Sequence, residues 1–500
     1  MTTALVLLAT LPLALTVSCA WLPRRVVQSL TLAVGLVVFG LVVAVAAEPG
    51  TVSVGFLRVD ALSKVFLLAV GFLYPAVAAY SIGYLADEAR LADRAGDGEA
   101  VAFTRYSRRF FLGLNAFAWS MLCAPMVDGL ALLWVAIEVT TVVSALLVAI
   151  DNTDGATEAA WKYVLIASSG LGIGLLATIL MYFAGAQVLG SSYDLAFAPL
   201  LEHAAVLPAT PVRVAFVLAV VGYGTKMGLV PLHTWLPDAH AEAPSPVSAL
   251  LSGALLAVSF YAILRYLQVA QVTLGGHFPR TVLLVFGILS LLLAALYVLD
   301  QGDIKRLLAY SSVEHMGILA IGVSFGAPVA LTGVLLHVLG HAAAKGNAFM
   351  GAGVLVRRFG TKDLMALRGG LDELRWSGPL LLVSVLALSA MPPFALFRSE
   401  FLIVVGGFSA SGGGAAAALV VLVTLAFFGI ATSTTSVLFQ RVPQPSGAMP
   451  DALAHPGEPS AWMVVPVVAG VAVLLVLGVH PPALLTDLLA RGAAELAGGQ

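Results

Sequence analysis

The stretch GYGTKMGLVPLHTWLPDAH, from Gly222 to His240, places a lysine and a helix-breaking proline inside an apolar region. On membrane-insertion scales an ammonium at bilayer depth costs about 2.5–3.5 kcal/mol. Pro231 also removes a backbone hydrogen-bond donor at a depth where water cannot replace it. A membrane chain that keeps both Lys226 and Pro231 needs a local reason for them, and a broken helix lining a hydrated site supplies one.

The composition of the whole chain indicates a membrane protein. Of its 500 residues, 60% are hydrophobic and 10% are charged, whereas soluble domains average about 25% charged residues. The net charge of −2 offers no basic face, so we expect no nucleic-acid partner. Cys19 and Cys123 lie in separate apolar runs, and no CxxC or Cys/His cluster occurs. We therefore expect no iron–sulfur or zinc centre, no other metal and no cofactor on this chain.

Apolar runs of about 20 residues, the length of a membrane helix, predict an all-α polytopic protein with about 14 transmembrane helices. The first run lacks a basic start and is followed by Arg24 and Arg25, so we interpret it as a membrane helix and not as a signal peptide. The predicted spans are residues 2–22, 28–47, 60–85, 110–128, 130–150, 161–185, 212–232, 245–269, 279–300, 304–325, 328–356, 378–408, 414–439 and 461–482.

Lysine and arginine gather in alternate loops, which orients the helices by the positive-inside rule. This pattern predicts a multi-pass protein of the inner (cytoplasmic) membrane with both termini outside. The loops then assigned to the inside carry Arg24, Arg25, Arg90, Arg94, Arg105, Arg108, Arg109, Lys305, Arg306, Arg357, Arg358, Lys362, Arg368, Arg375 and Arg441. The outside keeps Arg58, Arg213, Arg280 and Arg491, with Arg265 at a helix end.

Ionisable residues inside apolar runs are functional candidates by default. A buried lysine beside a glutamate can hold or release a proton, and imidazole transfers one near neutral pH. His337, His341 and Lys345 are spaced i, i+4, i+8 and so share one helix face. We predict a proton relay through Glu138, Lys226, His337, His341, Lys345 and Glu400, with His233, His240, His315, Lys305 and Arg398 as secondary candidates.

Several of these residues also have a structural interpretation. Glu138 and Lys226 would serve equally as a buried ion pair that joins two helices. His233 and His240 flank a Trp-Leu-Pro stretch where a structural or water-exposed role is as reasonable as a role in the relay. Arg398 has the length to reach the membrane surface.

Two proline breaks occur in corresponding halves of the chain, at Gly228–Pro231 and Met391–Pro393. Paired broken helices are typical of inverted-repeat transporters. We predict two inverted five-helix repeats, residues 110–269 and 279–439, each with a broken helix. Transmembrane helices within residues 1–109 precede them, and a loop and the last transmembrane helix within residues 440–500 follow.

Several long segments resemble the proton-conducting, antiporter-like membrane subunits of complex I, Mrp-type antiporters and membrane-bound NiFe hydrogenases. They include WVAIEVTTVVSALLVAIDNTDGATEAAWKY, KMGLVPLHTWLPDAHAEAPSPVSALLSG, DIKRLLAYSSVEHMGI, LLHVLGHAAAKGNAFMGAGVL and MPPFALFRSEFLIV. The stretches ATEAAWKY and LHTWLPDAHAEAPSPVSALLSG resemble component F of hydrogenase-4. The resemblance implies a mid-helix glutamate at Glu138, a broken-helix lysine at Lys226, the His337/His341/Lys345 face and an exit residue at Glu400.

The chain departs from that family pattern at one position. Many members hold a lysine or histidine where this sequence has Ala257. Water or hydroxyls such as Ser252 and Ser259 would then have to connect Lys226 with His341. We also expect no long lateral helix of the kind that some members carry.

Three functions follow as hypotheses. The first is a proton-translocating subunit of a redox complex, most similar to hydrogenase-4, with NADH:quinone oxidoreductase as the alternative complex. Other membrane and peripheral subunits would be its partners and would carry the NiFe and iron–sulfur centres, because this chain has no redox motif. The second is an ion or inorganic-carbon transporter subunit without redox coupling, moving H⁺ or Na⁺. The third is a subunit that no longer pumps, for which Ala257 is the main argument.

Overall fold

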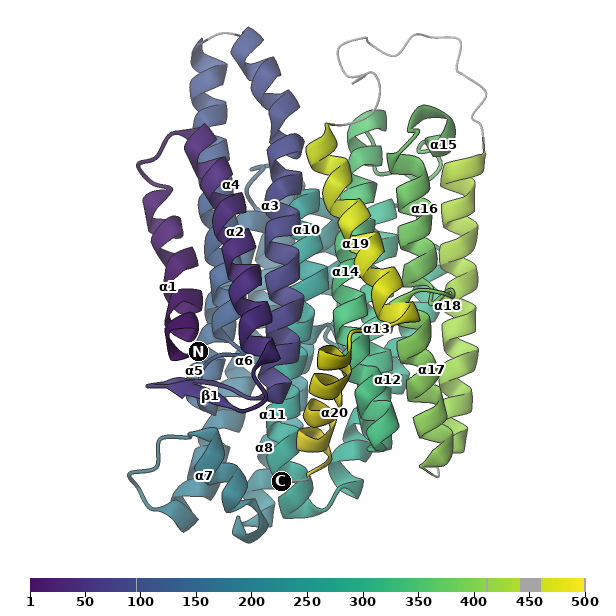
Figure 1. Cartoon of the computed structure of the whole chain (residues 1–500). Coiled ribbons are helices and arrows are strands. Elements are labelled where there is room, and N and C mark those ends of the chain that lie inside the picture. Colours follow the sequence, from purple (N-terminus) through teal and green to yellow (C-terminus); the bar gives the residue numbers. More distant parts are fainter. Residues whose placement is uncertain (96, 411, 441–459, 499–500) are drawn as a thin grey trace.

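The computed structural model is a bundle of helices that run roughly parallel to one another (Figure 1). It describes residues 1–95, 97–410, 412–440 and 460–498, without the side chains of residues 87 and 90–97. The side chains of Arg90 and Arg94, and the whole of Arg441, lie outside the described residues. The first helix begins and the last helix ends at the same end of the bundle (Figure 1), as an even number of spans requires.

Four helices and a short β-hairpin come first. α1 packs on α4, where Trp119 Nε1 donates to Ala9 O at 2.8 Å, and α2 packs on α3. The hairpin pairs Val52 with Val59 in antiparallel register. These elements are α1 (Thr2–Ser18), α2 (Arg24–Ala47), β1 (Val52–Val54), β2 (Leu57–Val59), α3 (Ala61–Ala95) and α4 (Asp97–Cys123).

The next group of helices contains the break predicted near Pro231. α8 ends at Met227, Gly228 adopts a left-handed conformation with φ of 87°, and the helix resumes as α9. A π-helical turn, Leu251–Leu255, joins α10 to α11 within one continuous helical segment. The elements are α5 (Leu130–Val148), α6 (Asp154–Leu189), α7 (Phe197–Glu202), a 3₁₀ turn (Ala204–Val206), α8 (Ala209–Met227), α9 (Trp235–Glu242), α10 (Ser245–Leu250) and α11 (Leu256–Leu274).

A close approach of α8 to α6 positions Lys226. A Cβ atom at Gly222 would lie 2.5 Å from Gly174 N, so only a glycine permits this contact. Small residues allow such close helix packing in membrane proteins. Because Lys226 lies one turn after Gly222 on the same face of α8, the contact directs its side chain toward α6.

The following group contains the second predicted break. α16 ends at Leu388 and α17 begins at Ala395, whereas α14 is continuous over 32 residues. Both interruptions predicted from proline are therefore confirmed, while the repeat boundaries stay a prediction. The elements are α12 (His277–Val298), α13 (Ile304–Phe325), α14 (Pro328–Phe359), α15 (Gly370–Glu373), α16 (Ser377–Leu388), α17 (Ala395–Ser409) and α18 (Gly413–Phe439).

Two helices end the described chain: α19 (Ala461–Val479), which packs on α14 and α3, and α20 (Ala483–Ala497). The sequence interpretation did not include α20. Its Glu495 carboxylate accepts hydrogen bonds from Ala61 N and Leu62 N at 3.1 and 3.0 Å. These are free donors at the start of α3, so α20 caps that helix.

Ten helices among the described residues are long and apolar enough to cross a membrane. The remaining predicted spans correspond to α1, which has 17 residues, to the more polar α4 and α8, and to the interrupted pair α16–α17. The all-α polytopic fold is confirmed. The number fourteen stays a prediction.

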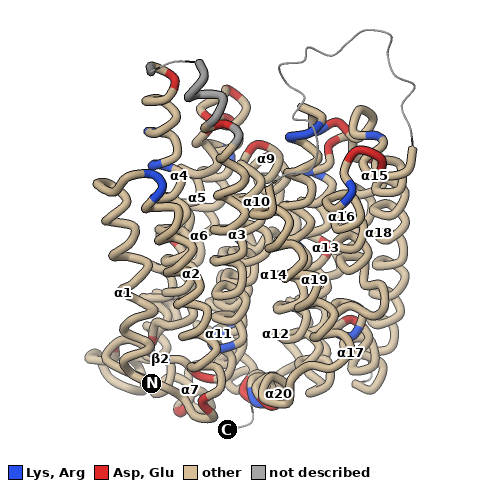
Figure 2. The backbone as a smooth tube through the Cα atoms, turned by 45° about the horizontal axis from the view of Figure 1, so that its top comes forward, with Lys and Arg blue, Asp and Glu red and all other residues tan. Residues whose placement is uncertain are grey.

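Charged residues lie mostly at the two ends of the bundle, and lysine and arginine gather at the end opposite the two termini (Figure 2). One residue is placed differently from the prediction. Arg265 was expected at a helix end, but it lies inside α11 with 2% of its surface exposed. It forms an ion pair with Asp60 at 2.7 Å, which explains an arginine away from the basic end of the bundle.

Candidate proton-relay site

Lys226 is fully buried at the last turn of α8. Its Nζ donates to Thr141 Oγ1 at 2.7 Å and to the hydroxyl of Tyr163, and it lies 4.8 Å from the centre of the Tyr163 ring. Trp235, at the start of α9, stacks on Tyr163 and donates from Nε1 to Thr225 O at 2.8 Å. The break after α8 is therefore folded back around the ammonium group.

Glu138 approaches this lysine without forming an ion pair with it. In the described part of the chain, Lys226 Nζ bonds to hydroxyls, and Glu138 Oε1 accepts from Ser168 Oγ at 3.3 Å. Glu138 Oε2 is buried and has no hydrogen-bond partner. Thr141, three residues after Glu138 on α5, is the lysine's nearest link to that helix. The alternative of a direct Glu138–Lys226 ion pair is therefore not what the structure contains.

Of two secondary candidates, His233 precedes α9 and His240 lies in its last turn. His233 is 6% exposed and its Nδ1 has no partner. His240 is fully buried, stacks on Phe349 at a ring-centre distance of 5.0 Å, and neither of its ring nitrogens has a partner. Such unpaired buried nitrogens are rare and usually indicate bound water or a functional role.

Lys305 and Lys362 form hydrogen bonds with the end of α9 and the segment that joins it to α10. Lys305 Nζ donates to Ala241 O and Ala243 O at 3.4 and 2.5 Å, and Lys362 Nζ bonds to Glu242 Oε1 at 2.9 Å. These bonds satisfy carbonyls at the end of α9, so Lys305 has a clear structural role here.

Lys345 lies mid-way along α14 and is fully buried. Its Nζ donates to Leu308 O at 2.8 Å and to the hydroxyl of Ser311, both on α13. Glu314, on the same helix α13, is 4% exposed, and its Oε2 has no hydrogen-bond partner. The sequence interpretation missed Glu314, although a carboxylate directly before His315 in an apolar run was a usable signal.

A hydrogen-bonded chain joins α13, α14 and α17. His315 Nδ1 lies 3.0 Å from His337 Nε2, and His337 Nδ1 lies 3.0 Å from Ser399 Oγ. Ser399 Oγ donates its single hydrogen to Leu396 O at 2.9 Å, so it accepts from His337. In the arrangement that satisfies all these contacts, His337 carries its hydrogen on Nδ1 and His315 donates from Nδ1. His315, only a secondary candidate from the sequence, is thus central to the cluster.

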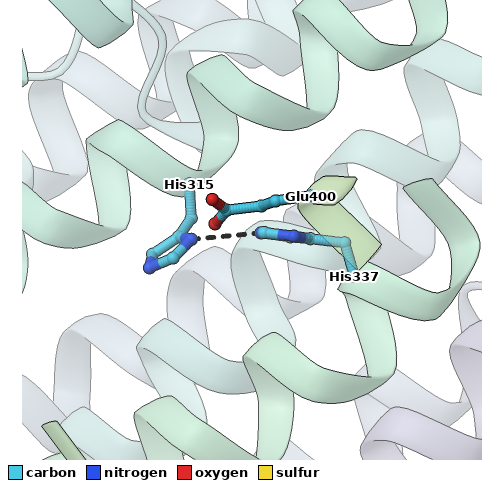
Figure 3. A group of neighbouring side chains, drawn as sticks. All are labelled: His315, His337 and Glu400. Atoms are coloured by element: carbon cyan, nitrogen blue, oxygen red, sulfur yellow. Dashed lines mark hydrogen bonds between the residues drawn. The ribbon is translucent and has the colours of Figure 1, made fainter. Parts of the chain in front are cut away.

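Glu400 completes this group. One ligand atom from each of His315, His337 and Glu400 lies within 4.8 Å of the other two, although the residues come from three helices (Figure 3). Glu400 also lines a cavity of about 330 Å³ between the α16–α17 break and α18. The carboxylate therefore connects the histidine pair to open space.

His341 lies on the same face of α14, as predicted, but outside the hydrogen-bonded chain. Its ring centre is 5.2 Å from that of His315 and 6.4 Å from that of His337. Both nitrogens of His341 are buried without partners. Proton transfer through His341 would require water or a change of rotamer.

The two serines expected to replace a titratable group near Ala257 differ in their contacts. Ser252 lies on the π-helical turn and its hydroxyl is 2.8 Å from that of Ser312 on α13. Ser259 donates to Leu255 O within its own helix. Only Ser252 therefore reaches toward the Lys345 site, and π-helical turns of this kind are frequent at functional sites.

Arg398 lies apart from the other candidates. Its Nη1 donates to Gly478 O and Val479 O, both at 3.3 Å, at the end of α19. A cation at a helix C-terminus is stabilised by the free carbonyls there. This contact explains Arg398 without a role in proton transfer.

The fold and this geometry agree with the family that the sequence matches. The family model described as "NADH:quinone oxidoreductase/Mrp antiporter, TM" matches residues 128–429. The chain belongs to this family. That range contains every residue of the predicted relay, and the resemblance to antiporter-like subunits is confirmed.

Two relatives of this antiporter-like chain carry hydrogenase-4 names. It is 36% identical over 357 residues to a hydrogenase-4 component F homolog of Methylacidiphilum infernorum, covering 71% of this chain and 73% of the relative. It is 33% identical to hydrogenase-4 component B of Escherichia coli, covering 69% of this chain and 50% of that relative. The chain thus spans only half the length of the second relative.

A solved structure, that of an Mrp complex from Dietzia, shares the fold. One of its chains superposes with a TM-score of 0.83, covering 99% of this chain and 98% of the other, at 21% sequence identity. The antiporter-like fold therefore extends over the described helices from α1 to α20.

Proposed function

We propose that this chain is the proton-translocating membrane subunit of a multisubunit redox complex of the hydrogenase-4 type. The observation that carries this proposal is the set of buried titratable groups, which comprises Lys226, Lys345 and the His315–His337–Ser399 chain beside Glu400. Packing alone does not require so many ionisable groups at bilayer depth.

In the first step, Lys226 takes up a proton and is stabilised by Thr141 and Tyr163. These hydrogen-bond partners are neutral, so loss of the proton breaks no direct ion pair. The carboxylate of Glu138 favours the charged lysine at a distance, and a partner's charge that acts on Glu138 would shift this balance.

In the second step, Lys345 holds a proton between Leu308 O and Ser311. The Ser252–Ser312 pair and bound water bridge the distance from the first site. From Lys345 the proton passes to the histidines and leaves through Glu400 and its cavity. Imidazoles suit this task because they both donate and accept protons near neutral pH.

Electron transfer belongs to partner subunits in this proposal. NiFe and iron–sulfur centres would reside there, since this chain carries no clustered cysteine ligands. The basic end of the bundle would face the cytoplasm and both termini the outside of an inner membrane, as the positive-inside rule requires.

Purification of the full chain with its native partners tests this assignment. We expect co-purifying nickel and hydrogen-evolving activity with a low-potential electron donor. A flavin and NADH oxidation without nickel would contradict the hydrogenase assignment and support an NADH:quinone oxidoreductase complex. That second candidate, and a redox-free antiporter, are favoured by the family description, which names both.

A further inference from the structure

Three potential metal ligands meet at the junction of α13, α14 and α17. We propose that His315, His337 and Glu400 form a binding site for a divalent transition-metal ion of the zinc type, which blocks the relay when bound. The three ligands are far apart in the sequence and form no recognisable motif. No metal site was expected from the sequence because it contains no such motif. Two imidazoles and a carboxylate are a usual ligand set for Zn²⁺.

The spacing of the ligand atoms is close to what a zinc ion needs. Zn–N bonds of about 2.0–2.1 Å at a tetrahedral angle place two nitrogens about 3.3 Å apart. His315 Nδ1 and His337 Nε2 are 3.0 Å apart, so a small separation of the rings admits the ion between them. All three ligand atoms lie within 4.8 Å of one another. The carboxylate of Glu400 lies beside the two imidazoles (Figure 3).

The surroundings already orient the ligands. Metal-binding histidines usually donate their second ring N–H to an oxygen acceptor, which fixes the ring. His337 does so through Nδ1 to Ser399 Oγ, which Leu396 O fixes in turn. One further observation points to an additional ligand: both nitrogens of the neighbouring His341 are buried without partners. The ring of His341 is 5.2 Å from that of His315, so His341 or a water is the fourth ligand.

A route for the ion exists on the Glu400 side. The cavity of about 330 Å³ includes Ser389 and Thr424 among its lining residues and reaches the α16–α17 break. Ser389 Oγ is buried and has no protein partner, so with Thr424 and Glu400 it offers oxygen ligands to an ion in a lining that is otherwise apolar. Entry here leads directly to the carboxylate, the first ligand that an incoming cation meets.

Binding has a direct consequence for the relay. The ion takes the place of the hydrogen between His315 Nδ1 and His337 Nε2. Because metals bind an unprotonated nitrogen, His315 then carries its hydrogen on Nε2 and the ring stays neutral. No proton can then pass between the two rings. The block rests on the proposed function, whereas metal binding itself does not.

Metal binding is measured on the full chain in lipid nanodiscs, with Co²⁺ as a spectroscopic probe for Zn²⁺. We expect one Co²⁺ per chain with intense visible bands typical of a tetrahedral nitrogen–oxygen site, displaced by Zn²⁺. His337→Gln and Glu400→Gln should each weaken binding at least about 10-fold, as removal of ligand-sphere groups does. His203→Gln is the matched control, because His203 follows α7, outside the junction of α13, α14 and α17, and bonds to Pro199 O.

Three results would overturn the proposal. They are no stoichiometric Co²⁺ binding to wild type, wild-type affinity in both ligand variants, or loss of binding in His203→Gln. If His337→Gln fails to fold, Glu400→Gln and His315→Gln decide. Proton uptake in chelator-treated liposomes is measured separately. Uptake without metal binding rejects only the metal site, and metal binding without any uptake rejects only the relay.

Discussion

The two lysines of the proposed relay, Lys226 and Lys345, differ in their helices and share one feature of their surroundings. Lys226 ends a helix and bonds to two hydroxyls, whereas Lys345 lies within an unbroken helix and bonds to a carbonyl and a hydroxyl. The carboxylate near the first, Glu138, is partly exposed, and the one near the second, Glu314, is buried. Neither lysine forms an ion pair in the described part of the chain. In both sites the charge is therefore held by neutral oxygens.

The Asp60–Arg265 pair shows the opposite arrangement. Both side chains are nearly inaccessible and are bonded at 2.7 Å, so each charge depends on the other. Removal of one member would strand a buried charge. The lysines can lose a proton without this penalty, and the difference separates a structural charge from one that changes during turnover.

The two helix breaks also differ in the side chains that they position. The first break directly follows Lys226 and folds Trp235 over its hydroxyl partner Tyr163. The second break leaves Lys345 untouched and instead brings Ser399 and Glu400 to the histidines. In the proposed relay, the first break therefore belongs to the entry and the second to the exit.

The largest expected effect is at Lys345. Lys345→Ala should lower proton pumping at least about 10-fold, because positioned acid–base groups contribute about 100-fold or more. Proton uptake by the assembled complex in liposomes measures this. Asn347→Ala, on the same helix and bonded to Val467 O, is the control and should keep its pumping rate per complex. Equal rates in the two variants would remove Lys345 from the relay.

Disruption of the Asp60–Arg265 pair should lower the stability of the fold and leave pumping unchanged. Asp60→Asn should lower the free energy of unfolding by about 3–5 kcal/mol, because it leaves Arg265 buried without its partner. Thermal unfolding of the purified chain measures this change, and pumping per assembled complex should persist. A loss of pumping without a loss of stability would show that Asp60 belongs to the relay.

The pair also predicts a dependence of stability on pH. Burial alone would raise the pKa of Asp60, but the nearby Arg265 guanidinium outweighs burial and lowers the pKa from 3.8 to about 2. A lowered carboxyl pKa stabilises the fold above the unfolded value and loses that contribution as the pH falls. Wild type should therefore lose this stabilisation between about pH 4 and pH 2, whereas Asp60→Asn should show no such component.

Variants of Glu314 and Glu138 test the difference between the two lysine sites. Glu314→Gln should slow pumping by about 3- to 10-fold, or about 1 kcal/mol in the barrier, and Glu138→Gln by less. The reason is that charges interact more strongly in the better-buried site. Glu158→Gln, exposed and paired with Lys162, is the control. A larger effect at Glu138 than at Glu314 would reverse the proposed ranking of the sites.

The smallest expected effect on pumping is at Ser252, which lies between the Lys226 site and the Lys345 site in the proposed relay. Ser252→Ala should slow pumping about 2-fold, since water replaces a lost hydroxyl with little energetic loss. Ser259→Ala, bonded only within its helix, should have no effect. Proton uptake of the two variants side by side measures the difference. Equal rates would mean that the proton does not pass the π-helical turn.

The sequence allowed prediction of features that depend on local spacing. Proline beside a lone charge predicted both helix breaks, and a four-residue period placed His337, His341 and Lys345 on one face. Contacts between residues far apart in the sequence could not be predicted from local spacing. Ser399 reaches His337 only because the second break sets the start of α17 against α14. Arg265 was misplaced for the same reason, since nothing local to it indicates Asp60.

The most direct test is proton uptake by the intact complex in liposomes, comparing Lys226→Ala with Lys64→Ala. Lys64 is also a buried lysine held by neutral oxygens, but it bonds to Glu48 O and Gly50 O beyond the end of α2 and has no place in the relay. We predict that Lys226→Ala loses at least about 90% of pumping per assembled complex and that Lys64→Ala keeps it. Unchanged pumping in assembled Lys226→Ala would make Lys226 a structural residue and would contradict the relay from Lys226 to Glu400.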